Sequence, residues 1–283
     1  FFKLSDRDVS FSGMKDKQAL TQQWFSVKQG NNQLRDANEL NAEHLHVQRI
    51  IKNKRKLRRG SHHSNQFSIR LRDLSGQGET LIDSLQNLSL EGVPNYFGEQ
   101  RFGRNGDNVA NAKLYFNGSL KIKEHYKRSL YISAARAHLF NLVLSQRVEE
   151  KNWNTYTSGD VMSLDGSSAS FKPESWDKNL ADRLNKKDIH PSGPMWGVGE
   201  LKTEDLSEAL EKEVASTEHE LKLGLENVGL QQERRALRSM PENLSYKVEN
   251  DTTIVLDFSL SKGAYATSFL RELVKLERQV YAK

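Results

Sequence analysis

A carboxylate between two lysines is the first feature of this sequence that could do chemistry. Asp16 follows Lys15 and precedes Lys17, three residues after Gly13. Neighbouring ammonium groups favour a negative charge on such a side chain, and a charged carboxylate can act as a nucleophile or a base in sugar chemistry. On the residues alone, a solvated Lys-Asp-Lys turn is the simpler interpretation.

A basic run is the second candidate. Residues 52–59 read KNKRKLRR and hold six cations in eight positions. Such a run can neutralise several phosphates and release their counterions. The alternative is a solvated loop or edge strand. If the partner is a nucleic acid, the candidate backbone contacts are Lys15, Lys54, Arg55, Lys56, Arg58 and Arg59.

Other motifs exclude common cofactor sites. His44, His46, His62 and His63 lack a carboxylate or cysteine pattern that would complete a metal site, so we expect no metal. The glycine-rich stretch of residues 98–106 matches neither a dinucleotide fingerprint nor a GK[ST] phosphate loop. It is read as a boundary loop or a contact to an RNA backbone.

Composition describes a polar, basic protein. The 283 residues are 36% hydrophobic and 28% charged, with a formal net charge of +5 and no cysteine. The isoelectric point is about 9.2 and the mean hydropathy is −0.73. A polyanion is a reasonable partner, thiolate chemistry is excluded, and no apolar run predicts a membrane span. We expect a cytoplasmic protein, since cysteine is absent and no signal-peptide pattern is present, and a monomer. The sequence opens on Phe1 and not on a methionine, so we expect that an upstream segment is missing from it.

Periodicity predicts the elements that must position these residues. Residues 1–92 read as short strands and turns, with strands at 22–27, 44–51 and 66–72. In the last of these, Phe67, Ile69 and Leu71 share one face.

The rest of the chain predicts helices and one further strand. Helical spacing covers 128–150 and 203–226, the latter capped by Thr203. Residues 200–226 hold nine acids and three lysines, a surface that should repel a polyanion. A strand at 254–260, a turn and a helix from Tyr265 to Val280 follow.

These elements divide the chain into three parts: a basic β-rich front (1–92), a helix-rich middle (93–240) and a β–α tail (241–283). One economical interpretation joins front and tail in one domain, with the middle inserted as a second. Periodicity does not show that front and tail pair.

Five stretches together resemble a known family. In chain order they are SFSGMKDKQALTQQW, HHSNQF, VPNYFGEQRFG, RSLYISAARAHLFN and KGAYATSFLREL. They resemble the motifs of the TruD family of tRNA pseudouridine synthases. The resemblance implies an α+β fold, in which a pseudouridine-synthase-type catalytic domain with a central antiparallel or mixed β-sheet carries an inserted α/β domain. It also implies isomerisation of uridine 13, in the D arm of tRNA, to pseudouridine, with tRNA as partner and no cofactor.

The resemblance also implies roles for single residues. Asp16 matches the catalytic aspartate that follows G-x-K. Asn65 and Phe67 match the polar and aromatic members of a GNxF motif that lie at the uridine, so the resemblance implies that they bind the substrate, although Ser64 replaces the glycine of the motif. Tyr265 matches the aromatic before Ala-Thr-Ser and is the third residue expected to bind the substrate. Each has a plainer interpretation: a turn asparagine for Asn65, a core phenylalanine for Phe67, and a helix-face residue for Tyr265.

The alternative function is a non-catalytic tRNA-binding protein or RNA chaperone, which the basic run would serve equally well.

Overall fold

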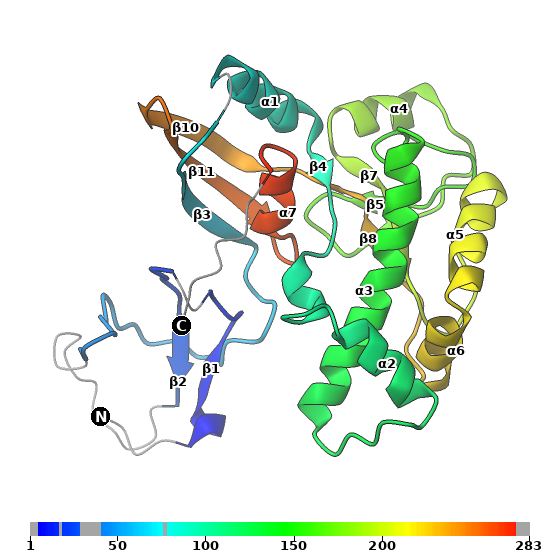
Figure 1. The fold of residues 1–283 in the computed structure, drawn as a ribbon, viewed down its shortest axis with the longest axis horizontal. Helices are drawn as coiled ribbons and strands as arrows, with labels where there is room; N and C mark the ends of the chain where they lie inside the picture. The colour runs from blue at the N-terminus through cyan, green and yellow to red at the C-terminus, as the bar shows by residue number, and fades with distance from the viewer. Residues whose placement is uncertain (1–4, 17–18, 29–40, 76–77, 276–283) are drawn as a thin grey trace. The chain divides into compact units, whose positions relative to one another are not determined.

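The computed structural model describes residues 5–16, 19–28, 41–75 and 78–275. It divides the chain into two compact units, Phe1–Asn65 and Gln66–Lys283 (Figure 1). Each unit is described by itself. Among the described residues, no helix combines the length and the apolar character that crossing a membrane would need.

The first unit is built on a small antiparallel sheet. After the 3-10 turn η1 (Asp6–Asp8), strands β1 (Val9–Phe11) and β2 (Phe25–Val27) pair. The hydroxyl groups of Ser10 and Ser26 lie 2.7 Å apart across this pair, and each also bonds the backbone of Leu57 at 3.0 Å. The basic run is therefore tied to the sheet at its one apolar residue.

The strand predicted at 44–51 is wrong. Among the described residues, the only β-pairing of this segment is an isolated bridge from Leu45 back to Ala42, closed by two backbone hydrogen bonds of 2.8 and 3.0 Å. Asn41 accepts from the amide of Val47 at 2.8 Å and so turns the chain instead of extending it. The strand predicted at 22–27 exists over its last three residues.

The second unit holds a three-stranded sheet made from both ends of the chain. Its strand order is β10 (Glu242–Asn250), β11 (Thr253–Ser261) and β3 (Ser64–Leu71). The alternation predicted at 66–72 and 254–260 is thus confirmed, because one face of each strand is covered. A front strand lies beside two tail strands in one sheet.

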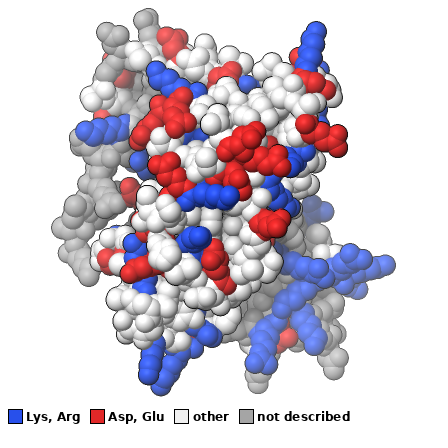
Figure 2. Space-filling view, turned by 90° about the vertical axis from the view of Figure 1, so that its right-hand side faces the viewer, with Lys and Arg blue, Asp and Glu red and all other residues white. Residues whose placement is uncertain are grey.

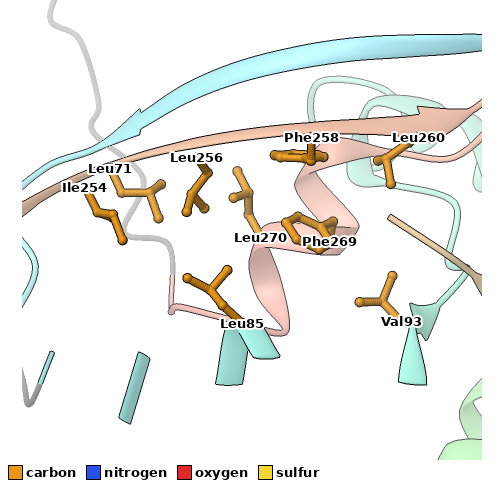
Figure 3. Close-up of a cluster of buried hydrophobic side chains, with 9 residues drawn as sticks. All are labelled: Leu71, Leu85, Val93, Ile254, Leu256, Phe258, Leu260, Phe269 and Leu270. Atoms are coloured by element: carbon orange, nitrogen blue, oxygen red, sulfur yellow. The ribbon is translucent and has the colours of Figure 1, made fainter. Parts of the chain in front are cut away.

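Two helices cover one face of this sheet. They are α1 (Gly78–Glu91) and α7 (Ala266–Arg271). Figure 3 shows the buried side chains of β11 directed toward α7 and toward Leu85 of α1. The buried cluster consists of Leu71, Leu85, Val93, Ile254, Leu256, Phe258, Leu260, Phe269 and Leu270.

Helix α1 corrects the prediction that residues 1–92 form strands and turns alone. Leu81, Leu85 and Leu88 recur every three or four residues and pack on the sheet cluster. At the other end, the helix predicted from Tyr265 to Val280 is confirmed only in part, because α7 ends at Arg271 and the described residues 272–275 are not helical. Leu276 and Val280 lie outside the described residues.

The chain enters and leaves its middle part at one place. Strand β4 (Val93–Pro94) pairs antiparallel with β9 (Arg238–Ser239). Gly92, at φ +76°, comes so close to this pair that an added Cβ would lie 2.6 Å from Met240 Sδ and 2.8 Å from Ser239 O. These contacts require a glycine at the end of α1.

A long helix organises the middle part. Helix α3 (His125–Glu149), predicted at 128–150, contacts α2 (Asn108–Phe116), α5 (Asp205–Thr217), α6 (His219–Asn227) and strand β7 (Ile189–Met195). Its alanines 134, 135 and 137 are fully buried. Such small side chains let neighbouring elements approach closely.

The middle part also holds a four-stranded antiparallel sheet. Its order is β6 (Ser170–Phe171), β5 (Met162–Leu164), β7 and β8 (Glu233–Ala236). Helix α4 (Lys178–Asn185) packs on β7, and a 3-10 turn η3 (Glu99–Phe102) precedes α2. The fold is therefore α+β, as expected, and the middle part combines helices with a sheet.

The helix predicted at 203–226 is two helices. The chain breaks at Glu218 (φ −111°, ψ 48°), whose carboxylate contacts Lys113 at 2.7 Å and His138 at 3.2 Å. The predicted cap is also wrong: Glu204 occupies the cap position, and Thr203 is buried and donates to Glu211 at 3.0 Å.

Acidic side chains gather on the face formed by α5 and α6 (Figure 2). Glu204, Asp205, Glu213 and Glu220 are exposed there. Others on these helices are neutralised within the second unit. Glu211, for example, is buried against Arg234 at 2.8 Å.

Candidate active site

Asp16 lies in the first unit, in the loop that follows β1. Its side chain is exposed, and it makes no hydrogen bond or ion pair with any residue that the structure describes. Lys17, the second lysine of the Lys-Asp-Lys turn, lies outside the described residues. A carboxylate in this setting is available to a substrate.

The loop before Asp16 is fastened to the first residues of β3 and to the segment before them. Lys15 Nζ donates to Asn65 Oδ1. Asn65 Nδ2 lies 3.3 Å from His62 Nε2, and His62 Nδ1 lies 3.0 Å from Ser12 Oγ. The structure therefore brings Lys15 and Asn65, two of the predicted site residues, into direct contact beside Asp16.

Gly13 allows this close approach. An added Cβ would lie 3.2 Å from His62 Cε1, tighter than most real contacts. The backbone amide of His62 also donates to Ser12 Oγ at 2.8 Å. The first two family-like stretches thus pack together within the first unit.

The five predicted backbone-contact residues of the basic run, Lys54, Arg55, Lys56, Arg58 and Arg59, are all exposed. Lys56 Nζ donates to the carbonyl of Arg7 at 2.6 Å, and the Arg59 guanidinium lies 5.8 Å from the Phe11 ring centroid. None of the five forms an ion pair with a carboxylate of the described residues. The run is open to an anionic partner.

Phe67 belongs to the second unit and is half-buried on β3. Its ring stacks on Phe258, with centroids 5.4 Å apart and planes at 25°. This packing fits the core interpretation of Phe67, and the part of the ring that stays accessible is what a stacked base would use.

Tyr265 precedes α7 and is half-buried among other aromatic residues. Its hydroxyl accepts from Arg101 Nε at 3.0 Å, and its ring meets Phe97 edge to face at 6.0 Å. Gly98 makes room, since an added Cβ would lie 3.0 Å from the Tyr265 ring. Tyr265 is therefore held at both its ring and its hydroxyl.

The other three family-like stretches converge around Tyr265 in the second unit. Ser268 Oγ donates to Tyr96 O at 3.0 Å, across 172 positions of sequence. From α3, Asn141 bonds both the amide and the carbonyl of Phe97 at 2.9 and 3.0 Å. Three of the five stretches thus pack together in the second unit.

Sequence reasoning missed two arginines here. Arg101 lies inside one of the quoted stretches, so its contact with Tyr265 had a signal. Arg235 had none, yet its guanidinium lies 4.1 Å from the Phe97 ring centroid and donates to Asn95 Oδ1 at 2.7 Å. An open hollow of about 330 Å³ follows η3, lined by Glu99, Phe102, Gly103, Arg104, Asn105 and Gly106.

Comparison with known proteins gives a consistent result. The family model for TruD, tRNA pseudouridine synthase D, matches residues 1–112 and 107–273. A tRNA pseudouridine synthase D of Nitrosococcus oceani is 42% identical over 275 residues, which cover 96% of this chain and 77% of that protein. The protein of the same name from Xanthomonas euvesicatoria is 41% identical over 285 residues, covering 95% and 77%.

A solved structure is similar in fold. It was determined under the name tRNA pseudouridine synthase D from Methanosarcina mazei and aligns with a TM-score of 0.67 and 19% identity. The alignment covers 97% of this chain and 82% of that one.

Proposed function

The chain belongs to the TruD family of tRNA pseudouridine synthases, and on that premise we propose that it converts uridine 13 of tRNA to pseudouridine with Asp16 as the catalytic carboxylate. The observation that carries the role of Asp16 is its setting. It is an exposed carboxylate on a loop that the Lys15–Asn65 contact fastens in place.

The reaction exchanges one bond of the nucleoside for another. The bond between N1 of uracil and C1′ of ribose breaks, the ring turns, and C5 bonds to C1′ with loss of the C5 hydrogen. A carboxylate can promote this by attack at C1′, by attack at C6, or by removing a proton from the sugar to give a glycal. Each of the three routes needs the charged form of Asp16 and no cofactor.

Lys15 and Asn65 hold the loop that carries this carboxylate. The Asn65 amide accepts from the Lys15 ammonium through its oxygen, so its nitrogen faces His62 Nε2 and donates to it. That orientation ties Asn65 to the loop and leaves the Asp16 oxygens to the substrate. We propose a positioning role for Lys15 and Asn65.

The target base must leave its stack in the folded tRNA, at a cost of a few kcal/mol. We propose that Phe67 and Tyr265 offset this by stacking on uracil, because base–aromatic stacking contributes about 1–3 kcal/mol per base. The cations of the basic run would hold the phosphates and supply affinity that falls with salt.

Residues 93–240 are proposed as the insertion within the catalytic domain. The pairing of β4 with β9 supports this, because it places the two ends of the insertion side by side. The shared sheet of β3, β11 and β10 supports the union of front and tail.

Release of tritium from C5-labelled uridine in tRNA tests the proposed function. We expect Asp16→Asn to bind tRNA and melt as the wild type does, yet to release no label. The matched control is Asp83→Asn, an exposed aspartate on α1, which should turn over normally. Full turnover by Asp16→Asn would remove this residue from the chemistry. Absence of release by the wild type, with tRNA still bound, would favour a non-catalytic tRNA-binding protein.

A further inference from the structure

Two arginines share one aromatic ring in the second unit. The guanidinium carbons of Arg101 and Arg235 lie 5.5 and 4.1 Å from the centroid of Phe97. Arg101 belongs to η3 and Arg235 to β8, two elements that are far apart in the sequence. Neither forms an ion pair with a carboxylate of the described residues.

Other arginines of this unit are arranged differently. Arg147 is bound to Asp160 at 2.8 Å, and both are almost fully buried. Arg234 is likewise bound to buried Glu211 at 2.8 Å. A buried cation is normally compensated in this way, because removing a charge from water is unfavourable without a partner of opposite sign.

Arg101 and Arg235 are half-buried and have no carboxylate partner among the described residues, which is electrostatically unfavourable. Burial, opposed by Tyr265 and reinforced by the charge of Arg101, lowers the pKa of Arg235 to about 10. Arg235 Nε is buried without a hydrogen-bond partner among the described residues. A bound anion would offset the unfavourable free energy of the partly desolvated cations and reduce the repulsion between them.

The pair holds the segment that carries Tyr265. Arg101 Nε donates to the Tyr265 hydroxyl at 3.0 Å, and Arg235 Nη2 donates to Gly263 O at 3.0 Å. Arg101 Nη1 donates to Ser133 Oγ at 2.8 Å. Arg101 Nη2 and Arg235 Nη1 make no hydrogen bond within the described part of the chain, so each guanidinium keeps an unused donor.

We propose that Arg101 and Arg235 form an anion seat that binds one phosphodiester of the substrate RNA, beside the base that Tyr265 stacks. Guanidinium groups suit this ligand because their planar N–H groups match the phosphate oxygens. This proposal rests on the proposed function. It adds that a phosphodiester of the RNA is the ligand of Arg101 and Arg235.

Neutral phosphate analogues test the seat directly. A set of tRNAs carries one methylphosphonate each, at the phosphates flanking uridine 13. Wild-type protein should lose about tenfold or more in affinity at one of these positions, the usual effect of losing a charge-assisted hydrogen bond. The double variant Arg101→Gln/Arg235→Gln should bind the modified and unmodified tRNAs equally well, because the contact is already absent, and each single variant should lose part of the sensitivity.

Salt dependence gives a second readout that a purely structural role would not change. Each variant should lower the slope of log K against log salt by about one relative to wild type. The control is Arg183→Gln, because Arg183 also lies over an aromatic ring (Phe171, 5.6 Å) but is bound to Asp188. It should leave the slope unchanged.

Three outcomes overturn the seat. The first is wild-type affinity that no flanking methylphosphonate lowers, a result that needs no variant and so holds even if Arg235→Gln fails to fold. The second is retained sensitivity to the methylphosphonate in folded variants, which would leave the arginines as supports of Tyr265 alone. In both, wild-type turnover remains and the proposed function survives. The third is a wild-type protein that binds no tRNA, which overturns the function and the seat together.

Discussion

At the residue scale, the proposed role of Phe67 adds base stacking to the core packing that the structure shows. Its ring stacks on Phe258 and packs against the sheet cluster, yet it stays partly exposed. A phenylalanine anchored on one side and open on the other is pre-ordered for a base, because stacking then costs no further side-chain entropy.

Phe67→Leu separates these two roles. Leucine keeps most of the apolar volume, so the free energy of unfolding should fall by only about 1 kcal/mol. The affinity for tRNA should fall about tenfold, because the stacking surface is lost. Urea unfolding and tRNA titration measure the two effects, with Ile69→Val on the same strand as the control that changes stability alone. Loss of the cooperative melt in Phe67→Leu would support a core role only.

His190 is buried between Arg238 and the more exposed Asp165, and its two hydrogen bonds fix its protonation. His190 Nδ1 accepts from Arg238 Nε at 2.8 Å, so this nitrogen carries no proton, and Nε2 donates to Asp165 at 2.8 Å. Burial, followed by the nearby charge of Arg238, lowers the pKa of His190, although Asp165 acts in the opposite direction. The hydrogen bond from His190 lowers the pKa of Asp165.

Stability should therefore decrease on acidification. As pH falls below the ordinary imidazole pKa of about 6.5, the unfolded chain binds a proton at His190. The folded chain binds that proton only at lower pH, because the pKa of His190 is lowered in the fold. The free energy of unfolding should drop by at most about 1.4 kcal/mol per pH unit from this group. Urea midpoints between pH 8 and pH 5 measure it. His190→Gln should flatten the dependence and exposed His63→Gln should not; equal slopes in all three proteins would contradict the assignment.

At the element scale, the sequence predicted what depends on local pattern. The strands at 66–72 and 254–260 alternate because one sheet face is buried, and the helix at 128–150 shows its own period. The break at Glu218 was not predictable, because Lys113 and His138 that hold it come from other helices. Thr203 reads as a cap, yet its hydroxyl is taken by Glu211.

The candidate site divides in the same way. Motif resemblance predicted Asp16, Asn65, Phe67 and Tyr265. Such resemblance can identify residues that come together only in the folded protein, whereas periodicity describes local structure alone. Arg235 lies in an ordinary strand pattern, and its place beside Phe97 follows from the path of β8 through the sheet. No local signal marks such a residue.

The junction of the middle part with the sheet can be tested at one glycine. Gly92 and Gly118 both follow a helix with φ near +80°. Alanine at either position should cost about 1–2 kcal/mol of unfolding free energy, because a Cβ disfavours that backbone region. At Gly118 nothing lies within 4 Å of an added Cβ, whereas at Gly92 it would meet Ser239 and Met240.

Gly92→Ala should therefore be the more damaging change, by a further 1–3 kcal/mol or so of overpacking. Urea unfolding of both variants isolates the contact between the entry and exit strands. Equal losses would mean that the β4–β9 junction yields easily and contributes little to holding the insertion.

At the scale of the whole molecule, the net charge of +5 is the sum over surfaces of opposite charge. The first unit carries exposed cations at 52–59, and the second carries exposed acids on α5 and α6 (Figure 2). Because ionic screening acts over about 8–10 Å, a polyanion senses the local surface more than the total charge. Affinity for tRNA should accordingly depend on where a charge is removed.

Removing three cations from the basic run tests this. Lys54, Arg55 and Arg58 are exposed, and none donates a side-chain hydrogen bond within the described residues. Their joint change to glutamine should weaken binding of every tRNA alike and lower the slope of log K against log salt by about 2–3, the effect of losing three phosphate contacts. The rate of label release at saturating tRNA should not change, because these residues lie outside the chemistry.

The matched control removes the same charge elsewhere. Lys202, Lys212 and Lys222 are the three lysines of the acidic region, and their joint change to glutamine gives the same net charge. If local surface decides, this protein keeps the wild-type salt slope. If total charge decides, both triple variants lose affinity and slope equally, and the basic run is then no more than a solvated loop.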